Sequence, residues 1–592
     1  MLRKTSYIVI LISLLAISNY TYAQYAFERF NLNPHGAMDS NPFRYVATDS
    51  FLFFAAKNDY TGFEPWKSDG TLAGTKVIKE ICTGGCSGTW GITIGSLNDK
   101  LIFVGSDYTH GEEPWVTDGT ANGTYMLKDI NSGFAPSSNV MPKSFTIGNK
   151  LYFTAGSSTH GLELWETDGT TNGTKLLKDI NPGGHSEPND FIHYNGKVYF
   201  VAYDGTHGFE LWVTDGTTNG TKMVKDIYTG SLSAHPSHLI VYNNKLYFVA
   251  NDATHGKELW VTDGTTNGTT LVKDFTTGYI STFFKNFILY NNKLFFDVLN
   301  GNTGNSEIWE TDGTTSGTKA TSSGFLGNEQ IIFNGKIYCD AMGELFSFDG
   351  TSSGLQLIKD IDPISGQAAN PKSFNIIGNK LVFKANDGVH NEELWVTDGT
   401  TNGTILLKDI NTDPKSSADP STITKYGNML IFRAIDSSKN IGIYATDGTT
   451  NGTIKLKGYD SVTRFSVKYS FTLYDSSLYF TAYDTGGYEM WKLTDTTLNT
   501  PPPNAVAALK NTPSKIQVAP NPAHDRVYIT LDKAYSNAQL TITDITGRSI
   551  LKQSITNTQT QIEVALPNLP TGTYLLNVHH KDGVLSQRLL IE

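Results

Sequence analysis

Three features are scarce in this 592-residue sequence, and each shortage excludes a class of protein. Cysteine occurs three times, which is too few for a scaffold held together by disulfides. Charged residues make up 17% and the net charge is −11, with no basic run, which argues against nucleic acid or an anionic membrane surface as a partner. Beyond residue 23, no stretch reaches the roughly 18 apolar residues of a transmembrane segment. Hydrophobic residues still make up 39%, so global disorder is excluded.

The cysteines leave one question open. Cys82 and Cys86 flank a Gly84-Gly85 turn that would let them meet, and an exported protein encounters oxidising conditions. A disulfide and two free thiols are both consistent with this spacing. A zinc site would need two more soft ligands, and none stands nearby. We therefore predict no metal and no cofactor, and we expect Cys339, which replaces an aromatic residue in a strand, to be a buried free thiol.

The first 23 residues have the order of a secretory signal peptide. Arg3 and Lys4 precede an apolar run over residues 7–17, and small residues at Thr21 and Ala23 offer a cleavage site. Cleavage after Ala23 would leave Gln24 first, where a lipid anchor would need cysteine. The leader predicts an exported protein.

A short motif recurs ten times between residues 60 and 495. In one copy, residues 164–170 read Leu-Trp-Glu-Thr-Asp-Gly-Thr. Successive copies are separated by 47–50 residues, except for one step of 37. A period of about 40–50 residues that contains several strands is typical of propellers. The acidic position holds Asp69, Asp118, Asp168, Asp215, Asp263, Asp312, Asp349, Asp398, Asp447 and, in a degenerate copy, Asp495. The aromatic position holds Trp66, Trp115, Trp165, Trp212, Trp260, Trp309, Phe346, Trp395, Tyr444 and Trp491.

Each unit reads as four strands joined by Asn- and Gly-rich turns. In one unit we predict strands over Ser237–Tyr242, Lys245–Asn251, Glu258–Thr262 and Thr269–Phe275, because polar and apolar residues alternate and β-branched and aromatic residues are frequent. Asn243-Asn244 marks a tight hairpin. The fold class predicted is all-β: a β-propeller of about ten four-stranded blades over residues 24–495.

The two ends of the repeat region predict how the ring closes. The last unit has three strands, Phe471–Tyr474, Leu478–Tyr483 and Glu489–Leu493, and then runs into three prolines at 501–503. Residues 26–32 look like an orphan fourth strand. This strand would complete the last blade and remove both sheet edges. Two five-bladed rings with a seam near Asp349, at the short step, are the alternative.

The motif Glu-Leu-Trp-x-x-Asp-Gly-Thr, as at residues 258–265, resembles the bacterial ELWxxDGT repeat family. The resemblance covers roughly residues 45–495. It implies an exported bacterial protein and brings no catalytic residues. Phe346 in place of tryptophan and Gly442 in place of glutamate depart from the pattern.

The chain changes character after a Pro-, Thr- and Asn-rich linker at residues 496–514. Residues 515–592 open with Pro520-Asn521-Pro522, continue with short strands at Val527–Leu531 and Leu540–Thr543, and carry Gly572-Thr573-Tyr574 before a further strand at Leu575–Val578. This segment resembles the C-terminal sorting domain of the type IX secretion system of Bacteroidetes. The resemblance implies a small β-sandwich that the type IX secretion machinery reads, and a protein that is secreted or held at the cell surface.

The repeated polar residues are expected to be structural. The Asp of each Asp-Gly-Thr loop can accept local backbone N–H groups, and one carboxylate per loop is too few for calcium, which takes about 6–8 oxygen ligands. A glutamate two residues before the aromatic recurs in nine units, as Glu163 does, and strand four carries a recurring lysine, as Lys178. We predict a Glu–Lys pair between these strands.

Five turns between strands two and three carry histidine: His110, His160, His207, His255 and His390. Packed sheets lie about 10 Å apart, so histidines of successive blades cannot share one metal ion. Packing within the turn is favoured, with ligand contact as the alternative role.

Catalysis requires one asymmetric cluster of reactive groups, and the sequence has no Ser-His-Asp motif, no His-Glu-x-x-His and no nucleotide loop. A binding or adhesion module for a glycan or protein ligand is therefore favoured over a secreted carbohydrate-active or other hydrolytic enzyme. The loops on one face of the ring vary from blade to blade, and variable loops on a rigid frame are where binding occurs. The ligand-binding candidates there are the aromatic residues Phe134, Tyr279, Phe283 and Phe284.

Overall fold

A computed structural model describes most of the chain as two compact units, with the boundary after residue 500. In the first unit it describes residues 25–33, 39–58, 60–132, 143–276, 278–301, 303–363, 368–458, 466–468 and 471–496. In the second it describes residues 516–519, 526–531, 538–544, 549–555, 561–566, 572–580 and 583–591. The predicted leader, Phe134 and nearly all of the linker lie outside these residues.

The first unit consists of ten antiparallel sheets, here called blades one to ten. Blades one to nine are each built in chain order from strands A to D, and blade ten takes its strand D from the N-terminus of the chain. Blades one to five are β2 (Phe43–Ala47), β3 (Leu52–Ala56), β4 (Glu64–Ser68) and β5 (Lys76–Val77); β6 (Thr89–Leu97), β7 (Lys100–Asp107), β8 (Gly111–Thr117) and β9 (Tyr125–Met126); β10 (Ser144–Ile147), β11 (Lys150–Ser157), β12 (Gly161–Thr167) and β13 (Lys175–Lys178); β14 (Asn189–Tyr194), β15 (Lys197–Tyr203), β16 (Phe209–Thr214) and β17 (Lys222–Lys225); β18 (Ser237–Tyr242), β19 (Lys245–Asp252), β20 (Gly256–Thr262) and β21 (Thr270–Lys273).

Blades six to ten continue in the same order. They are β22 (Phe283–Tyr290), β23 (Lys293–Leu299), β24 (Ser306–Thr311) and β25 (Lys319–Ser323); β26 (Gln330–Phe333), β27 (Lys336–Cys339), β28 (Leu345–Phe348) and β29 (Gln356–Lys359), with a 3₁₀ turn at Ala341–Gly343; β30 (Lys372–Ile377), β31 (Lys380–Asn386), β32 (Glu392–Thr397) and β33 (Ile405–Lys408); β34 (Ser421–Tyr426), β35 (Met429–Ile435), β36 (Ile441–Thr446) and β37 (Ile454–Gly458); β38 (Ser466–Val467), β39 (Thr472–Tyr474), β40 (Ser477–Asp484), β41 (Gly487–Asp495) and β1 (Tyr25–Phe30).

Blade five shows why this sequence forms such sheets. Strand B, β19, is buried over five consecutive residues because neighbouring blades cover both of its faces, so it reads as an unbroken apolar run. The A–B turn is Asn243-Asn244 with φ of 50° and 54°, the left-handed pair that a tight hairpin needs and that asparagine tolerates. All four strands lie within two residues of their predicted bounds.

The N-terminal strand closes the ring. β1 pairs antiparallel with β41 from Tyr25 opposite Asp495 to Phe30 opposite Met490. The backbone N–H of Leu32 then donates to the Glu489 carboxylate, 3.2 Å away. Two segments about 460 residues apart thus form one sheet, and β1 supplies its strand D.

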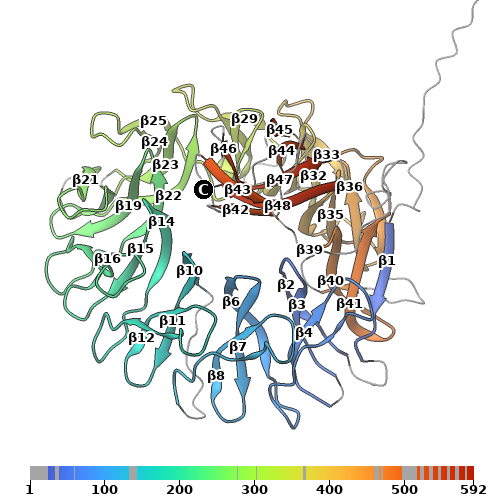
Figure 1. Cartoon of the computed structure of the whole chain (residues 1–592). Coiled ribbons are helices and arrows are strands. Elements are labelled where there is room, and N and C mark those ends of the chain that lie inside the picture. Colours follow the sequence, from blue (N-terminus) through green and yellow to red (C-terminus); the bar gives the residue numbers. More distant parts are fainter. Residues whose placement is uncertain are drawn as a thin grey trace, which may run out of the picture. The chain divides into compact units, whose positions relative to one another are not determined.

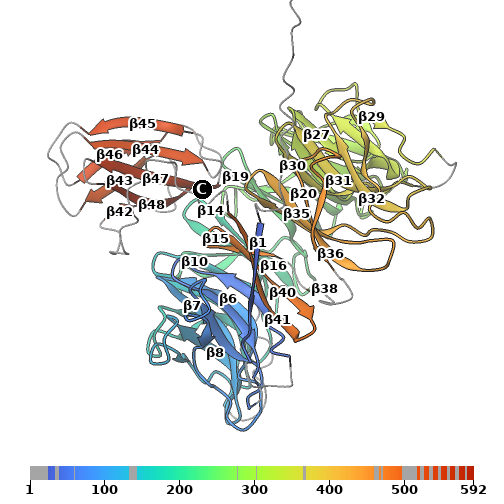
Figure 2. The same ribbon diagram turned by 90° about the vertical axis from the view of Figure 1, so that its right-hand side faces the viewer.

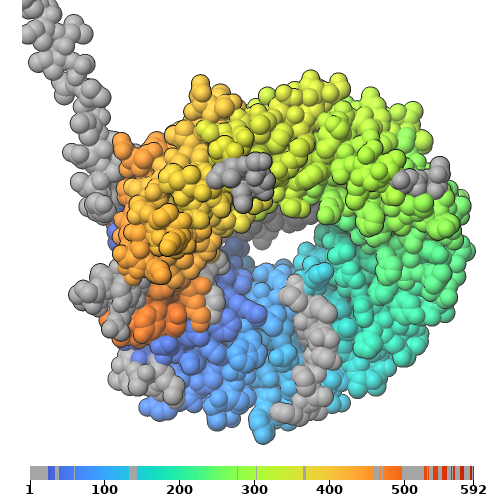
Figure 3. All heavy atoms as spheres, turned by 180° about the vertical axis from the view of Figure 1, so that it is seen from behind, coloured from blue at the N-terminus to red at the C-terminus, as the bar shows by residue number. Residues whose placement is uncertain are grey.

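The hydrophobic core is divided among the interfaces between neighbouring blades. Ten clusters of buried side chains in the described part of the first unit match the ten interfaces. Phe30 and Tyr479 of blade ten pack with Leu52 and Trp66 of blade one, and Tyr247 of blade five packs in the cluster shared with blade six. The blades therefore form one ring rather than two, as Figure 1 shows, and Figure 3 shows its central opening from behind.

The second unit is a small sandwich. One sheet has the order β42 (Ile516–Ala519), β43 (Arg526–Leu531), β46 (Gln561–Ala565), and the other β45 (Ser549–Ile555), β44 (Ala538–Asp544), β47 (Gly572–His580), β48 (Gly583–Ile591). Figure 2 shows the strands of this unit. Side chains from both sheets, Ile529 and Val564 from one and Leu540 and Leu576 from the other, share one core. The predicted fold class, a propeller followed by a small β-sandwich, is confirmed.

Candidate binding site

The Asp-Gly-Thr loops between strands C and D are stabilised by their own atoms. In blade three, Asp168 Oδ1 accepts the backbone N–H of Thr170 at 2.9 Å and its hydroxyl at 2.6 Å. Gly173 has no side chain because a Cβ there would lie about 2 Å from the Asp168 carboxylate. Thr167 and Thr174 share a hydrogen bond of 2.7 Å across the loop. The same bonds recur around the ring, so these carboxylates are occupied by turn contacts.

The repeated glutamate holds the connection to the next blade, and the predicted Glu–Lys pair is wrong. Glu163 is fully buried and accepts the backbone N–H groups of Ile180 (2.8 Å) and Asn181 (3.2 Å) and the Ser186 hydroxyl (2.6 Å). Burial raises the pKa of Glu163 to about 7. Eight of the nine glutamates take such bonds from the D–A connection: Glu64, Glu113, Glu163, Glu210, Glu258, Glu344, Glu393 and Glu489.

The repeated lysine links neighbouring blades instead. Lys178 of blade three donates to the Thr221 carbonyl of blade four at 2.9 Å, and Lys225 of blade four donates to the Thr269 carbonyl of blade five at 2.8 Å. The Lys225 ammonium also lies 5.6 Å from the centre of the Trp260 ring. The lysine points away from its own blade's glutamate, which explains why the predicted pair does not form.

The five histidines belong to local turns in five separate blades. His110, His207, His255 and His390 each place Nδ1 2.7–2.8 Å from the aspartate three residues earlier, and His160 contacts Ser157 and Thr159. The hydrogen bond to Asp204 raises the pKa of His207. Among the described residues no group of three or more metal-binding side chains is found.

Cys82 and Cys86 form a disulfide in the connection between blades one and two. In blade three the equivalent of Cys82 is Asn181, whose Nδ2 donates to the His185 carbonyl 2.9 Å away, also four residues on. The disulfide therefore replaces a hydrogen bond that closes this connection elsewhere. Cys339 is a buried free thiol.

Blade six departs from this pattern. Its glutamate, Glu307, accepts Nε1–H of Trp309 at 3.0 Å. The N–H of the D–A connection, from Leu326, goes to both oxygens of Asp297 on strand B, 2.9 Å from each. Asp297 is 5% exposed and stands where blade five has the apolar Val249. The buried carboxylate of this blade has thus moved from strand C to strand B.

Blade seven leaves part of blade six uncovered. The ladder between β26 and β27 stops at Gln330 opposite Cys339, and the chain then turns in the 3₁₀ turn. The ladder between β22 and β23 runs further, through Lys285 opposite Asp297 to Phe283 opposite Leu299. The 37-residue step of the repeat is this shortened blade, and a hollow opens beside the extended hairpin.

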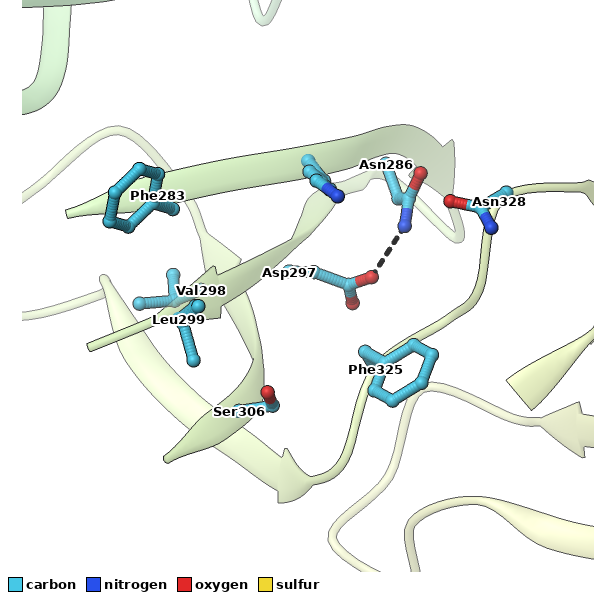
Figure 4. A pocket seen from close by; sticks show the side chains of 9 residues that line it. Phe283, Asn286, Asp297, Val298, Leu299, Ser306, Phe325 and Asn328 are labelled. Carbon is cyan, nitrogen blue, oxygen red and sulfur yellow. Dashed lines mark hydrogen bonds between the residues drawn. The ribbon is translucent and has the colours of Figure 1, made fainter. Parts of the chain in front are cut away.

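The hollow is a cavity of about 400 Å³, here called the blade-six pocket. It is lined by Phe283, Lys285, Asn286, Asp297, Val298, Leu299, Ser306, Phe325 and Asn328. Figure 4 shows Phe283, Val298 and Leu299 on one side and Phe325 and Asn328 on the other, with the Asp297 carboxylate between them. The lining residues come from strand starts and ends on the face of the B–C turns and D–A connections, which is the variable face.

The polar groups of the pocket are set by one hydrogen bond. Asn286 Nδ2 donates to Asp297 Oδ2 at 2.7 Å, and Asn286 has a φ of 57° at the bulge where β22 shifts register against β23. Burial raises the pKa of Asp297 to about 6, although these hydrogen bonds and the nearby Lys285 favour the charged form. The hydrogen bond to Asp297 fixes the orientation of the Asn286 amide.

The structure separates the four aromatic candidates. Phe283 lines the pocket and is 58% exposed, whereas its neighbour Phe284 is 5% exposed and packs in the core between blades five and six, so Phe284 as a ligand contact is wrong. Tyr279 is 84% exposed but does not line the pocket, and Phe134 lies outside the described residues. Sequence reasoning missed Asp297, Asn286 and Phe325. An aspartate at a position that is apolar in blade five, next to the short step, was the available signal.

Residues 517–592 match the family described as "Secretion system C-terminal sorting domain". The predicted sorting domain of the type IX kind is confirmed, and the protein is secreted or exported to the cell surface. Among the described residues, no helix is long and apolar enough to span a membrane. No curated protein matches the chain.

Several solved structures show a weak likeness. A puromycin hydrolase is 13% identical over 59% of this chain, with a TM-score of 0.29, and the chain spans 58% of the hydrolase. PorZ, a surface component of the type IX secretion system of Porphyromonas gingivalis, is 12% identical over 94% of this chain and 87% of its own, with a TM-score of 0.24. The extracellular domain of a putative one-component system of B. thetaiotaomicron is 10% identical over 97% of this chain and all of its own, with a TM-score of 0.21. None of them assigns a function to this chain.

Proposed function

We propose that this protein is an exported binding module and that the blade-six pocket is its ligand site. The observation that carries the proposal is the change in blade six, where Asp297 has taken over the connection to the next blade and the shortened blade seven leaves the end of the hairpin open. In the other blades, the repeated aspartate, glutamate and lysine side chains form hydrogen bonds within turns, with the D–A connections or with the neighbouring blade. A concave site with apolar walls and a few oriented polar groups is the usual form of a ligand site.

The propeller suits this role because the ring holds the pocket in place. Val298 at 1% exposure and Phe284 at 5% anchor the hairpin in the core, so their neighbours on the other face are fixed in position. The body, residues 24–495, belongs in this proposal to the ELWxxDGT repeat proteins. Residues 1–23 are the signal peptide, residues 496–514 the linker, and residues 515–592 the address read by the type IX secretion machinery.

Arrays of glycans and of peptides, probed in parallel with the full exported protein, test the proposal. The test variant is the double substitution Phe283→Ser with Phe325→Ser, and both side chains are exposed enough for the fold to tolerate it. The control is Leu232→Ser, because Leu232 is 58% exposed in another D–A connection. We expect a ligand on one array whose binding is lost in the double variant and kept in the control, at unchanged melting temperature.

Two results would contradict the proposal. The first is a ligand that the double variant binds as tightly as the wild type. The second is that neither array yields any ligand. Tyr279→Ser is a further comparison, and we expect it to keep binding because Tyr279 is exposed outside the pocket.

A further inference from the structure

The walls of the blade-six pocket are more apolar than a hydroxyl-rich ligand would favour. Leu299 and Phe325 are 41% and 38% exposed. The apolar surface continues beyond the pocket on both sides: the Ile280 side chain lies against Gly301, just past the end of β23, and the Met342 side chain lies beside Gly324, next to Phe325. Met342 is 58% exposed and Ile280 40%. A contiguous exposed apolar patch on a soluble protein marks an interaction site.

This surface discriminates between two ligand chemistries. The side chains of Leu299, Ile280 and Met342 offer no hydrogen bond, so a sugar that covered them would leave buried hydroxyl groups unpaired, which is unfavourable. A large aliphatic or aromatic side chain would instead gain free energy from being buried there. The apolar part of the pocket therefore favours a peptide side chain over a sugar.

The polar part of the pocket suits a peptide backbone. The Asn286 amide is held by Asp297, and it keeps one N–H and its carbonyl oxygen for a ligand. The Asn328 side chain makes no hydrogen bond to any residue that the structure describes. A carboxamide offers the same donor and acceptor as a peptide group, so two asparagines can pair with the backbone of an extended segment.

The charges indicate what flanks the apolar side chain. Asp297 is buried, and its oxygens already accept the Leu326 N–H, which is shared between both of them, and the Asn286 Nδ2–H. Lys285, directly opposite Asp297 in the ladder, is exposed and forms no ion pair with any described residue. Among the residues that line the pocket, Lys285 therefore carries the accessible charge, which is positive and complements an acidic group on the ligand.

On these grounds, and resting on the proposed function, we infer that the pocket binds an extended peptide segment of a partner protein. The segment places one large apolar side chain between Phe283 and Phe325 (Figure 4). An acidic residue beside it faces Lys285, and Asn286 and Asn328 pair with its backbone.

A phage library of random twelve-residue peptides, panned on the full exported protein, supplies the probe. We expect the enriched peptides to share a large apolar residue next to Asp or Glu. Affinity of one synthetic peptide is then measured by fluorescence anisotropy. Phe325→Ala should weaken binding at least about tenfold. Lys285→Met should weaken it about threefold and flatten its salt dependence, whereas Lys245→Met, at an exposed lysine on the opposite face, should leave both unchanged.

The outcomes separate this inference from the proposed function. Peptides that bind the double variant with Phe283→Ser and Phe325→Ser as well as the wild type overturn the inference. Glycans that lose binding in the double variant, without any peptide doing so, overturn the inference and leave the proposed function standing. Failure of both libraries overturns both. Melting temperatures close to the wild-type value show that the variants are folded.

Discussion

Blades five and six share one strand pattern and differ in what their carboxylates do. In blade five, Glu258 accepts the Phe275 N–H at 3.1 Å and the hydroxyls of Thr276 and Thr282, and strand B is apolar at Val249. In blade six, Asp297 on strand B holds the connection, and Glu307 contacts Trp309 near the surface. The first arrangement uses its buried polar groups for the fold alone. The second leaves a carboxylate and its asparagine partner beside an open pocket.

This difference shows how a repeat protein can gain a pocket without a new fold. The ring tolerates the loss of about twelve residues in blade seven because each blade packs on its neighbours through its central strands. The shortening falls on the start of strand A, the end of strand B and the B–C turn, while the A–B turn is kept, so the core survives and only the rim opens. Function on this scaffold is expected where the spacing of the repeat changes.

The largest expected difference concerns the repeated tryptophan. Trp260 of blade five is 6% exposed and packs in the core between blades four and five, so Trp260→Ala should cost about 3–5 kcal/mol of unfolding free energy. Trp309 is only partly buried, so Trp309→Ala should cost about 2 kcal/mol or less. Urea unfolding, followed by tryptophan fluorescence, measures both. Equal losses would show that blade six is as tightly packed as the others.

A smaller difference is expected for the repeated glutamate. Glu258→Ala leaves the Phe275 N–H and two threonine hydroxyls buried without their hydrogen-bond acceptor. We expect the free energy of unfolding to fall by about 2–4 kcal/mol. Glu307→Ala removes one hydrogen bond to Trp309 and should cost less than about 1 kcal/mol. The same urea titration measures both. A large loss for Glu307→Ala would mean that Asp297 has not taken over its role.

The last expected effect is a pH dependence that the blades share. Burial raises the pKa of six glutamates from 4.5 to about 7, namely Glu64, Glu113, Glu163, Glu210, Glu258 and Glu393. Between these values the folded state binds more protons than the unfolded state, so stability should fall as the pH rises from 4.5 to about 7. For Asp297 the same fall runs from 3.8 to about 6. The raised pKa values of the turn histidines act in the same direction, because the stability they add is lost as the pH rises through them.

Below pH 4.5 the dependence of stability on pH has the opposite sign. The loop aspartates, such as Asp168, have lowered pKa values because of their threonine hydrogen bonds, so the stability they add is lost as the pH falls. Melting temperature recorded from pH 3 to 9 should therefore peak near pH 4–5, and Glu258→Gln should reduce the slope between 4.5 and 7. A melting temperature that rises through that interval is the opposite of what these carboxyl groups require.

The repeat allowed most of the fold to be predicted. Strand positions follow from alternation, and the orphan strand at residues 26–32 marked the partner of β41, which is seen over Tyr25–Phe30. The hydrogen-bond partners of Glu163 and Lys178 could not be predicted from the sequence. The alternation of polar and apolar residues tells which face of a strand a residue is on, but not which connection or blade covers that face. Phe283 and Phe284 looked equivalent because both were expected in a loop, whereas β22 begins at Phe283 and places their side chains on opposite faces. The ladder register of β22, with its bulge after Lys285, decides which of them is exposed.

The claim that blade six carries the site and the regular blades only support it is tested most directly by a binding footprint. Hydrogen exchange of the full exported protein is compared with and without a saturating peptide from the library. We expect slower exchange within residues 278–301 and 324–330 and unchanged exchange in blades two to four. Protection centred on the regular blades, with residues 278–301 unaffected, would contradict it.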